Sequence, residues 1–426
     1  MGRALSSGGA GVPIVAALVF AFAGAALHCS SFGADDASAG GDGDAGTDVE
    51  TVARLVPSCD GDRCDCDGDP TNGRETAVLG EDRDNCGACG HACLPVPPLG
   101  DRTCTRGVCT AVPIASNQMG ATALVTRGDD LAWGTDDGFV VTAKPGGWAP
   151  VPLVPKQDRP IDSLAMDDDF VYAVANYLPN NDGRLIRLQR AGTCAAACAA
   201  LETPQPEGAV NRVLLADRRL FFVFGRSGNV ADDLRGAAPD GFTGGGTTLY
   251  TGPFLGDIAV GGGFLHVAEH GSSGIGAERL MVRPVDACPA STPQCAVALV
   301  ADAVVTGMAA DDDAVYFADA KTRTLGRKTR SGSSLIEPLV RDLTVAGGVA
   351  LDGDDVYFSE HDPAADGGAL TTGRVRRIGK NGKCASYLPC PQTVAAGIPA
   401  LTSFAVGTTM VFFTSGTSGQ VLRTPK

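Results

Sequence analysis

The chain has 426 residues, 44% of them hydrophobic, with 57 glycines, 26 prolines and a formal net charge of −15. The many turn-forming residues favour short strands over a helical protein. The negative charge repels phosphate backbones and anionic lipid head groups, which excludes nucleic acid and the bare membrane surface as partners.

Residues 1–29 have the pattern of a secretory signal. Arg3 is the only charged residue, and an uninterrupted apolar run from Val12 to Leu27 follows it. A basic start, an apolar stretch of this length and small residues near its end are typical of an export signal. The stretch is short for a transmembrane helix. We therefore expect the chain to be exported.

Cys29 stands in the sequence AALHCSS, which resembles the lipidation site of bacterial lipoproteins, with His28 where that family prefers a small residue. Lipidation would make the acyl chains the only membrane contact; signal cleavage near Ala25 is the alternative. Residues 30–52 are rich in Gly, Ala, Ser and Asp and predict a disordered acidic tether. The expected location is the cell envelope, as an outer-membrane-attached lipoprotein or a periplasmic or extracellular protein.

Residues 53–109 predict a small module held together by disulfides. With Cys29 set aside, 14 of the 15 cysteines remain, an even number, as exported disulfide-bonded proteins require. Hydrophobic residues are few here, so cross-links must supply the stability. The module cysteines are Cys59, Cys64, Cys66, Cys86, Cys89, Cys93, Cys104 and Cys109.

Two features of the module leave alternatives open. The only pairing we predict is Cys104–Cys109, because CTRGVC reads as a bridged hairpin. The segment NCGACGHAC, with His91, also has spacing that suits a zinc site, although export favours disulfides.

A calcium site is a second hypothesis for the module. Asp65, Asp67 and Asp69 alternate in a Gly-containing segment, which resembles the start of a calcium loop. The closing acidic ligand is not at the expected offset, and an acidic solvated turn is the alternative. We expect no other cofactor.

From about residue 110 to residue 426 the chain repeats. Each unit has an apolar strand A, an acidic turn, an aromatic strand B, a variable connection, a basic strand C and an apolar strand D. Spacings of 39 to 55 residues between aligned positions are typical of propeller blades. The fold class is therefore all-β, a seven-bladed β-propeller, with six or eight blades as alternatives. The aligned positions in strand B are Trp133, Tyr172, Phe222, His266, Tyr316, Tyr357 and Phe412.

The last repeat stops at Lys426, after its strand C. The segment VCTAVPIA, residues 108–115, resembles a strand D, so we expect the two ends to complete one sheet and close the ring. The aspartate triplets 167–169 and 311–313 lie between strands A and B, where turn formation is favoured over metal binding. Three cysteine pairs at C–D turns are expected to form local disulfides: Cys194 with Cys198, Cys288 with Cys295, and Cys384 with Cys390.

The NCGACGHAC cluster and the DD-x-VYF units resemble the cysteine-rich, propeller-bearing lipoproteins of myxobacteria-like genomes. The segments Val315–Asp319 (VYFAD) and Val356–Glu360 (VYFSE) are similar to degenerate YWTD and NHL propeller repeats. This resemblance implies a fold and a location, and it leaves the function open, because propellers host many activities.

No nucleophile elbow, zinc-protease motif or phosphate loop was found in the mature sequence. Two Glu–His pairs, Glu269–His270 and Glu360–His361, follow strand B in repeats four and six. On one face of a propeller they could bind a ligand or metal, or act as acid and base. The alternative is that they are exposed loop residues too far apart to cooperate.

Long B–C connections, expected near residues 177–183, 225–246, 270–278 and 360–372, would gather on that same face. Variable loops on a rigid scaffold usually carry recognition. The sequence therefore favours a binding module for an unknown protein, peptide or glycan. A propeller-type carbohydrate lyase or hydrolase and a passive structural component of the envelope are the alternatives.

Overall fold

The computed structural model describes residues 58–426 with internal gaps. The predicted signal, Cys29 and the tether lie outside the described residues, as do Cys194, Cys198 and Cys288. The described residues form strands and no α-helix, so none of their segments is a helix that could cross a membrane. The gaps are 68, 70, 72–75, 96–101, 154–155, 176–182, 191–200, 203–207, 227–230, 242–244, 271–277, 287–294, 331–334, 363–371 and 385–389.

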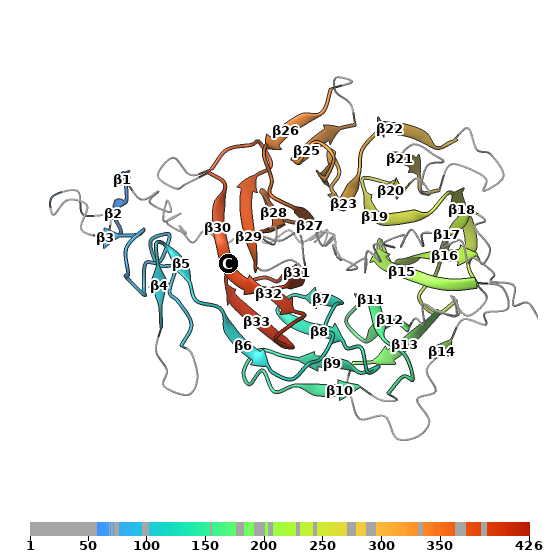
Figure 1. The fold of residues 1–426 in the computed structure, drawn as a ribbon, viewed down its shortest axis with the longest axis horizontal. Helices are drawn as coiled ribbons and strands as arrows, with labels where there is room; N and C mark the ends of the chain where they lie inside the picture. The colour runs from blue at the N-terminus through green and yellow to red at the C-terminus, as the bar shows by residue number, and fades with distance from the viewer. Residues whose placement is uncertain are drawn as a thin grey trace, which may run out of the picture.

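The described residues form seven four-stranded antiparallel sheets, here sheets 1 to 7 in chain order, which stand around a common axis (Figure 1). Sheets 1 to 3 contain β7 (Leu124–Arg127), β8 (Asp130–Gly134), β9 (Val140–Ala143) and β10 (Val151–Leu153); β11 (Ile161–Met166), β12 (Phe170–Ala175), β13 (Arg184–Gln189) and β14 (Leu201–Glu202); and β15 (Gly208–Ala216), β16 (Arg219–Arg226), β17 (Asp232–Ala237) and β18 (Thr247–Gly252).

Sheets 4 to 7 follow the same order. They contain β19 (Leu255–Gly261), β20 (Phe264–Glu269), β21 (Arg279–Pro284) and β22 (Val297–Ala301); β23 (Val305–Ala310), β24 (Ala314–Asp319), β25 (Thr324–Thr329) and β26 (Glu337–Val340); β27 (Ala346–Asp352), β28 (Asp355–His361), β29 (Thr372–Gly379) and β30 (Gln392–Pro399); and β31 (Leu401–Val406), β32 (Met410–Ser415), β33 (Gln420–Pro425) and β6 (Val112–Ala115).

The first strand of each sheet, strand A, lies innermost. Neighbouring A strands contact one another in order around the axis, and β31 contacts β7 to complete the circle. The core lies between the sheets: Trp133 of sheet 1 and Phe412 of sheet 7 share one buried cluster, and Tyr172 and Phe222 share another. Face-to-face packing of consecutive sheets is the architecture of a β-propeller.

The aligned position in strand B is confirmed as the register of the repeat. All seven residues lie in β8, β12, β16, β20, β24, β28 and β32 and are at most 1% exposed. Five of the seven face an alanine of strand A, as Tyr316 faces Ala309 and Tyr357 faces Ala350. A large ring beside a small residue lets consecutive sheets pack closely.

The two ends of the propeller region share sheet 7. The segment 108–115 contributes β6, which pairs antiparallel with β33 through Val421 with Ala115 and Arg423 with Val112. Sheets 7 and 1 are also joined by polar side chains: the backbone amide and Oγ1 of Thr409 both donate to the Asp129 carboxylate, at 2.9 and 2.6 Å. The two ends of the propeller region are therefore joined both by the pairing of β6 with β33 and by the contact between Thr409 and Asp129.

The prediction that residues 225–246 form one long B–C connection in the third repeat is wrong. The middle of this segment forms β17, the strand C of sheet 3, and β18 supplies strand D. The sequence DDLRGA of β17 conceals this strand because it starts with two buried carboxylates. Asp232 accepts the amide of Leu255 at 2.8 Å, and Asp233 accepts the hydroxyl of Thr251 at 2.8 Å.

The aspartate triplets form turns, as predicted. One carboxylate oxygen of Asp167 accepts the amides of Asp169 and Phe170, at 2.9 and 2.6 Å. Asp311 binds the amides of Asp313 and Ala314 in the same way. A side chain that accepts its own downstream amides replaces a backbone turn.

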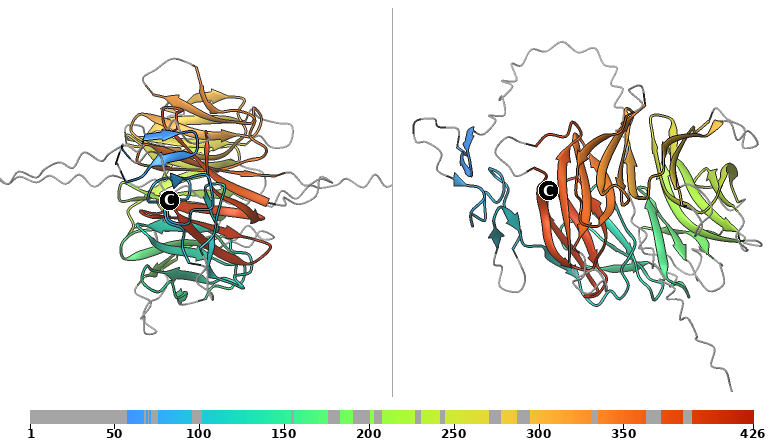
Figure 2. Two further views of the ribbon diagram at one scale, coloured as in Figure 1. Left: turned by 90° about the vertical axis from the view of Figure 1, so that its left-hand side faces the viewer. Right: turned by 45° about the horizontal axis from the view of Figure 1, so that its top comes forward.

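The cysteine-rich module precedes the propeller and lies outside the ring, near sheet 6 (Figure 2). It contains the sheet β1 (Ser58–Asp60), β2 (Arg63–Asp65) and β3 (Thr76–Ala77), and the hairpin β4 (Cys104–Thr105) and β5 (Val108–Cys109). Its four disulfides join Cys59 to Cys64, Cys66 to Cys89, Cys86 to Cys104, and Cys93 to Cys109.

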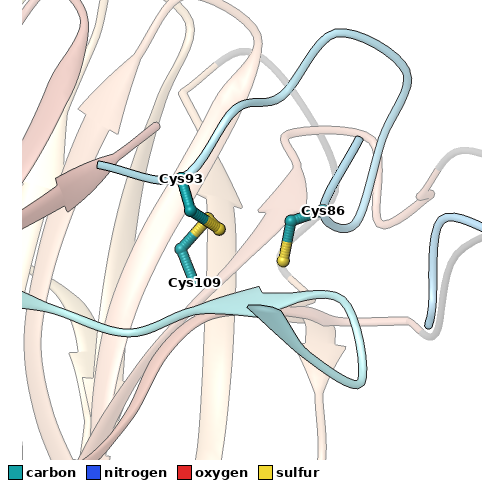
Figure 3. A group of neighbouring side chains, drawn as sticks. All are labelled: Cys86, Cys93 and Cys109. Atoms are coloured by element: carbon teal, nitrogen blue, oxygen red, sulfur yellow. A yellow bond between two sulfur atoms is a disulfide. The ribbon is translucent and has the colours of Figure 1, made fainter. Parts of the chain in front are cut away.

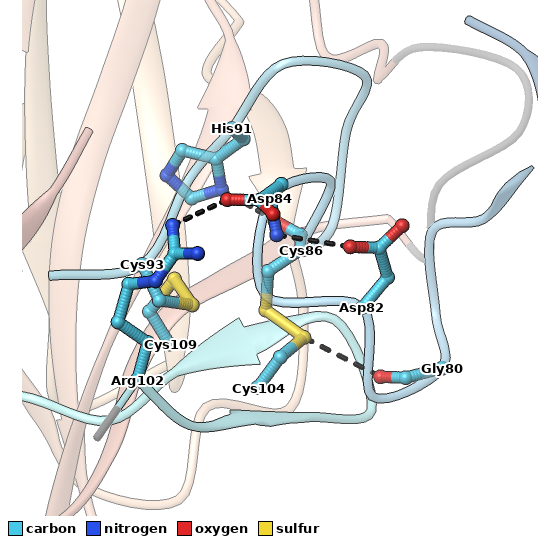
Figure 4. Close-up of a disulfide and its surroundings, with 9 residues drawn as sticks. All are labelled: Gly80, Asp82, Asp84, Cys86, His91, Cys93, Arg102, Cys104 and Cys109. Atoms are coloured by element: carbon cyan, nitrogen blue, oxygen red, sulfur yellow. Dashed lines mark hydrogen bonds and ion pairs between the residues drawn. A yellow bond between two sulfur atoms is a disulfide. The ribbon is translucent and has the colours of Figure 1, made fainter. Parts of the chain in front are cut away.

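The predicted Cys104–Cys109 disulfide is wrong. The two residues do face each other across the hairpin, but each bonds to the loop that contains Cys86 and Cys93 (Figure 4). These bridges fasten separate segments in a module with little other core, which a hairpin bridge could not do. Outside the module, Cys384 bonds to Cys390 between β29 and β30, and Cys295 is also disulfide-bonded.

Candidate functional site

The two ends of the propeller differ in their connections. The A–B turns are uniformly short: 128–129, 167–169, 217–218, 262–263, 311–313, 353–354 and 407–409. The B–C connections vary widely: 135–139, 176–183, 227–231, 270–278, 320–323, 362–371 and 416–419. Because consecutive strands are antiparallel, the B–C and D–A connections share one end and the A–B and C–D connections share the other. Most of the long B–C connections lie outside the described residues.

Glu269 ends β20, and its side chain binds residues of sheets 3 and 4. It is 1% exposed, and its carboxylate binds the Tyr250 hydroxyl and the Arg279 guanidinium. Burial and the hydrogen bond to this carboxylate raise the pKa of Tyr250. Glu269 is therefore committed to an ion pair between β20 and β21.

His270 lies on the opposite side of the strand, because successive side chains of a strand alternate. Its amide donates to the carbonyl of Phe254 at 3.0 Å, and its imidazole covers Gly256 so closely that a Cβ there would overlap the ring. Burial, followed by the positive charge of Arg212, lowers the pKa of His270.

Glu360 repeats the arrangement of Glu269 in sheet 6. It is 2% exposed and accepts hydrogen bonds from Arg374 at 2.9 Å and Arg376 at 2.6 Å. Burial opposes ionisation, but the hydrogen bonds from Arg376 and Arg374 outweigh it and hold the pKa of the Glu360 carboxyl below its usual value. The next residue, His361, is 4% exposed, and its Nδ1 has no hydrogen-bond partner among the described residues.

The two histidines occupy the same position of the repeat, and small residues make room for them. The Nε2 atom of His361 lies 3.2 Å from where a Cβ of Gly347 would stand, as His270 lies over Gly256. Sheet 7 shows the reverse arrangement: Thr402 occupies the strand A position, and a Cβ at Gly416 would lie 2.8 Å from its Cγ2. In each of these three sheets, a glycine at one of the two positions therefore leaves room for the larger side chain at the other.

The structure does not bring the two Glu–His pairs together. Arginine side chains of the same sheet bind each glutamate: Arg279 binds Glu269, and Arg374 and Arg376 bind Glu360. Both Glu–His pairs lie at strand ends, whereas the alternative placed them in exposed loops. Within the described part of the chain, the only group of three potential metal ligands within 4.8 Å of one another is Cys86, Cys93 and Cys109.

The aspartates considered for calcium make local turns. Asp67 accepts the amide of Asp69 at 2.9 Å, and Asp69 accepts the amide and hydroxyl of Thr71 at 2.9 and 2.6 Å. The bonds from Thr71 lower the pKa of the Asp69 carboxyl. These contacts fit the acidic-turn alternative, and the calcium site stays a prediction.

A feature not expected from the sequence is a hollow of about 710 Å³ at the A–B end of the axis, lined by the A–B turns of six sheets. Cations that follow strand C latch consecutive sheets around it. Arg330 of sheet 5 donates to the carbonyl of Gly261 in sheet 4 at 2.6 Å, and Lys380 of sheet 6 pairs with Asp311 of sheet 5 at 2.7 Å. The Arg or Lys that recurs directly after strand C is the sequence pattern from which these contacts between sheets could have been predicted.

A second concave region lies where the module meets the propeller. This groove has a volume of about 690 Å³, and Arg106 and Val108 of the module line it together with Gln392, Ile398 and Leu422 of sheets 6 and 7. The module therefore rests against the outer strands of the last two sheets.

Comparison with known proteins identifies the fold. No protein-family model matches the chain, and no curated protein matches it. Virginiamycin B lyase from Staphylococcus aureus is similar in structure, with a TM-score of 0.50, 13% identity, and coverage of 74% of this chain and 98% of that one. The U3-55K structure is similar with a TM-score of 0.50 and 11% identity, and the match covers 74% of this chain and 98% of that one. The WD40 propeller domain of Doa1 has a TM-score of 0.49 and 11% identity, and the match covers 73% of this chain and 94% of that one. The chain contains a β-propeller; identities this low carry no activity over.

Proposed function

We propose that the chain is an exported, lipid-anchored binding module, in which a seven-bladed propeller presents its B–C connections to a partner protein. The observation that carries this proposal is the contrast between the A–B turns and the B–C connections. The A–B turns hardly vary, whereas the B–C connections extend to 270–278 and 362–371 in some sheets and shrink to 320–323 in others. Length variation among the B–C connections, on a scaffold whose A–B turns are uniformly short, is typical of a recognition surface.

The proposal of a binding role is preferred to that of a carbohydrate lyase or hydrolase. Glu269 and Glu360 were the acidic residues that the sequence offered for acid–base chemistry, and both are buried and bind arginines of the adjacent strand C. Both carboxylates are at most 2% exposed, and the hydrogen bonds from Arg376 and Arg374 hold the pKa of the Glu360 carboxyl below its usual value. A solvent-accessible base would be needed for the enzymatic alternative.

Export is supported by the cysteine chemistry. Four disulfides in a module of about fifty residues, with a further one at Cys384–Cys390, suit an oxidising compartment. The signal-like residues 1–29 and the lipidation-like Cys29 provide the route and the anchor in this proposal.

Site-directed photo-crosslinking tests the recognition surface. A photoreactive residue at Lys321 or Thr417, exposed in short B–C connections, should yield adducts with one protein in intact envelopes of the producing cells. The same residue at Arg218 or Thr408, exposed in A–B turns, serves as the matched control. Adducts found only at the A–B positions would refute the proposed surface. Absence of adducts at all four would favour a passive structural component.

A loop exchange sharpens the test. Replacing residues 362–371 with the short sequence GTSG of residues 416–419 keeps β28 and β29 joined by a connection that sheet 7 already uses. We expect the Lys321 and Thr417 adduct yields to fall while thermal unfolding is unchanged. An unchanged yield would argue against the B–C connections as the contact.

Lipid anchoring has its own test. In cells fed an alkyne-bearing fatty acid, the chain should become labelled, and Cys29→Ala should remove the label and release the protein from membranes. Cys384→Ala is the matched control for the loss of a cysteine and should retain the label. Full labelling of Cys29→Ala would contradict the anchor without affecting the proposal of a binding role.

A further inference from the structure

Four buried cysteines of the module pack against one another. Cys86, Cys93, Cys104 and Cys109 form one cluster, and each is at most 3% exposed. The sulfur atoms of Cys86, Cys93 and Cys109 all lie within 4.8 Å of one another, and Cys104 is bonded to Cys86 (Figures 3 and 4). Two disulfides are therefore stacked so closely that their four sulfurs occupy a single small volume.

This arrangement has the donor set and compactness of a structural zinc site. Four thiolates at about 2.3 Å from a tetrahedral zinc ion stand roughly 3.8 Å from one another, and the sulfurs of Cys86, Cys93 and Cys109 already lie within 4.8 Å of one another. Two ligands would come from the loop 86–93 and two from the hairpin β4–β5, in which Cys104 and Cys109 face each other. The spacing between Cys104 and Cys109 is usual for zinc ligands, and that between Cys86 and Cys93 is longer.

Burial makes this a closed site. A zinc ion with four protein ligands and no water has a structural rather than a catalytic role. Cys104 Sγ is also 3.3 Å from the carbonyl of Gly80. The other two module disulfides, Cys59–Cys64 and Cys66–Cys89, do not join the group.

We propose that the reduced module binds one Zn²⁺ through Cys86, Cys93, Cys104 and Cys109, so that the same four sulfurs stabilise the module either as two disulfides or as a zinc site. A dithiol reductant supplies two electrons and two protons to each disulfide and becomes a disulfide itself. Four thiols result, and they release four protons as their thiolates bind the ion. Oxidation reverses the sequence and expels the zinc.

Metal titration of the full chain tests the proposal. After reduction with a phosphine and removal of metal, the chain should bind one Co²⁺ with the absorption spectrum of a tetrahedral tetrathiolate, and Zn²⁺ should displace it. The oxidised chain should bind none. The variant C86S/C93S/C104S/C109S should lose this binding, whereas C59S/C64S, which also removes one module disulfide, should keep it. Binding that survives in the quadruple variant would overturn the proposal.

Thiol alkylation gives a second readout on the unmutated chain. With Zn²⁺ present, the reduced protein should show these four cysteines protected from alkylation, while Cys59 and Cys64 react fully. Equal reaction of all six in the presence of Zn²⁺ would refute the site, and this result does not depend on whether any variant folds.

Discussion

Asp257 on β19 accepts a 2.9 Å hydrogen bond from the backbone amide of Met308 on β23, and its second carboxylate oxygen pairs with Arg212 on β15. One buried side chain thus joins three consecutive inner strands. Asp257 is 5% exposed, so its charge depends on these contacts rather than on water.

Asp257→Ala should destabilise the chain strongly. The substitution removes the carboxylate that pairs with the largely buried Arg212 guanidinium and accepts the Met308 amide, and breaking such a buried pair costs about 3–5 kcal/mol. Urea unfolding of the full chain measures it. Asp286→Ala is the control: its pair with Arg219 also joins two sheets but is solvent-exposed, and should contribute about 0–1 kcal/mol. Similar losses for both variants would contradict this account.

The buried His266 should make the fold sensitive to acid. It is fully buried and has no hydrogen-bond partner in the part of the chain that the structure describes, and burial, then the charge of Arg330, lowers its pKa from 6.5 to about 3. Below pH 6.5 the unfolded chain takes up a proton that the folded chain refuses until about pH 3. The free energy of unfolding should therefore decrease as the pH is lowered from 6.5 to about 3, and His266 contributes at most about 1.4 kcal/mol per pH unit to this decrease.

His266→Phe tests this assignment, because Phe222 and Phe412 occupy the same repeat position. The variant should show a shallower loss of stability between pH 6.5 and pH 4 in urea titrations. His270 and His361, whose pKa values are also lowered, remain in both proteins and cancel in the difference. Parallel pH profiles would show that His266 is not responsible.

Close backbone approach should make Gly307 intolerant of a side chain. A Cβ at residue 307 would lie 2.6 Å from Cα of Gly348 and 2.7 Å from the carbonyl oxygen of Gly347, on the neighbouring inner strand. Gly307→Ala should cost about 1–3 kcal/mol in thermal or urea unfolding, since backbone atoms must move. Gly147→Ala, where nothing lies within 4 Å, should be neutral. A neutral Gly307→Ala would mean that the inner strands can separate freely.

Removal of β6 should open the ring. A chain that begins at Ala111 keeps β6 and should unfold cooperatively, whereas one that begins at Ser116 exposes the edge of β33. Unpaired edges favour association with other strands. We expect the shorter chain to have a lower unfolding midpoint and to oligomerise in light scattering. Identical behaviour of the two chains would show that β6 is dispensable.

Much of the propeller was predictable because its signals are local and repeated. The aromatic residue of strand B and the Asx turns of Asp167 and Asp311 depend on neighbours a few residues away. Sheet 3 was misread because β17 begins with carboxylates whose acceptor roles involve Thr251 and Leu255, which only the folded chain brings near.

The site residues were harder, because their environment is set by distant partners. Strand alternation separates Glu269 from His270, but nothing in the sequence shows that Tyr250 and Arg279 bind the glutamate. Likewise, Cys104 and Cys109 sit opposite each other as expected, yet the choice of disulfide depends on a loop whose approach is a tertiary event.

The pairing of β6 with β33 sets the order in which the molecule can form. Six sheets are built from consecutive strands and can assemble as they emerge, but sheet 7 must wait for its two ends, which lie on either side of all the others. Bringing such distant segments together carries the largest loop-closure entropy in the fold. We therefore expect closure of sheet 7 to be the slowest step of folding, and until it happens the edge of β33 stays unpaired.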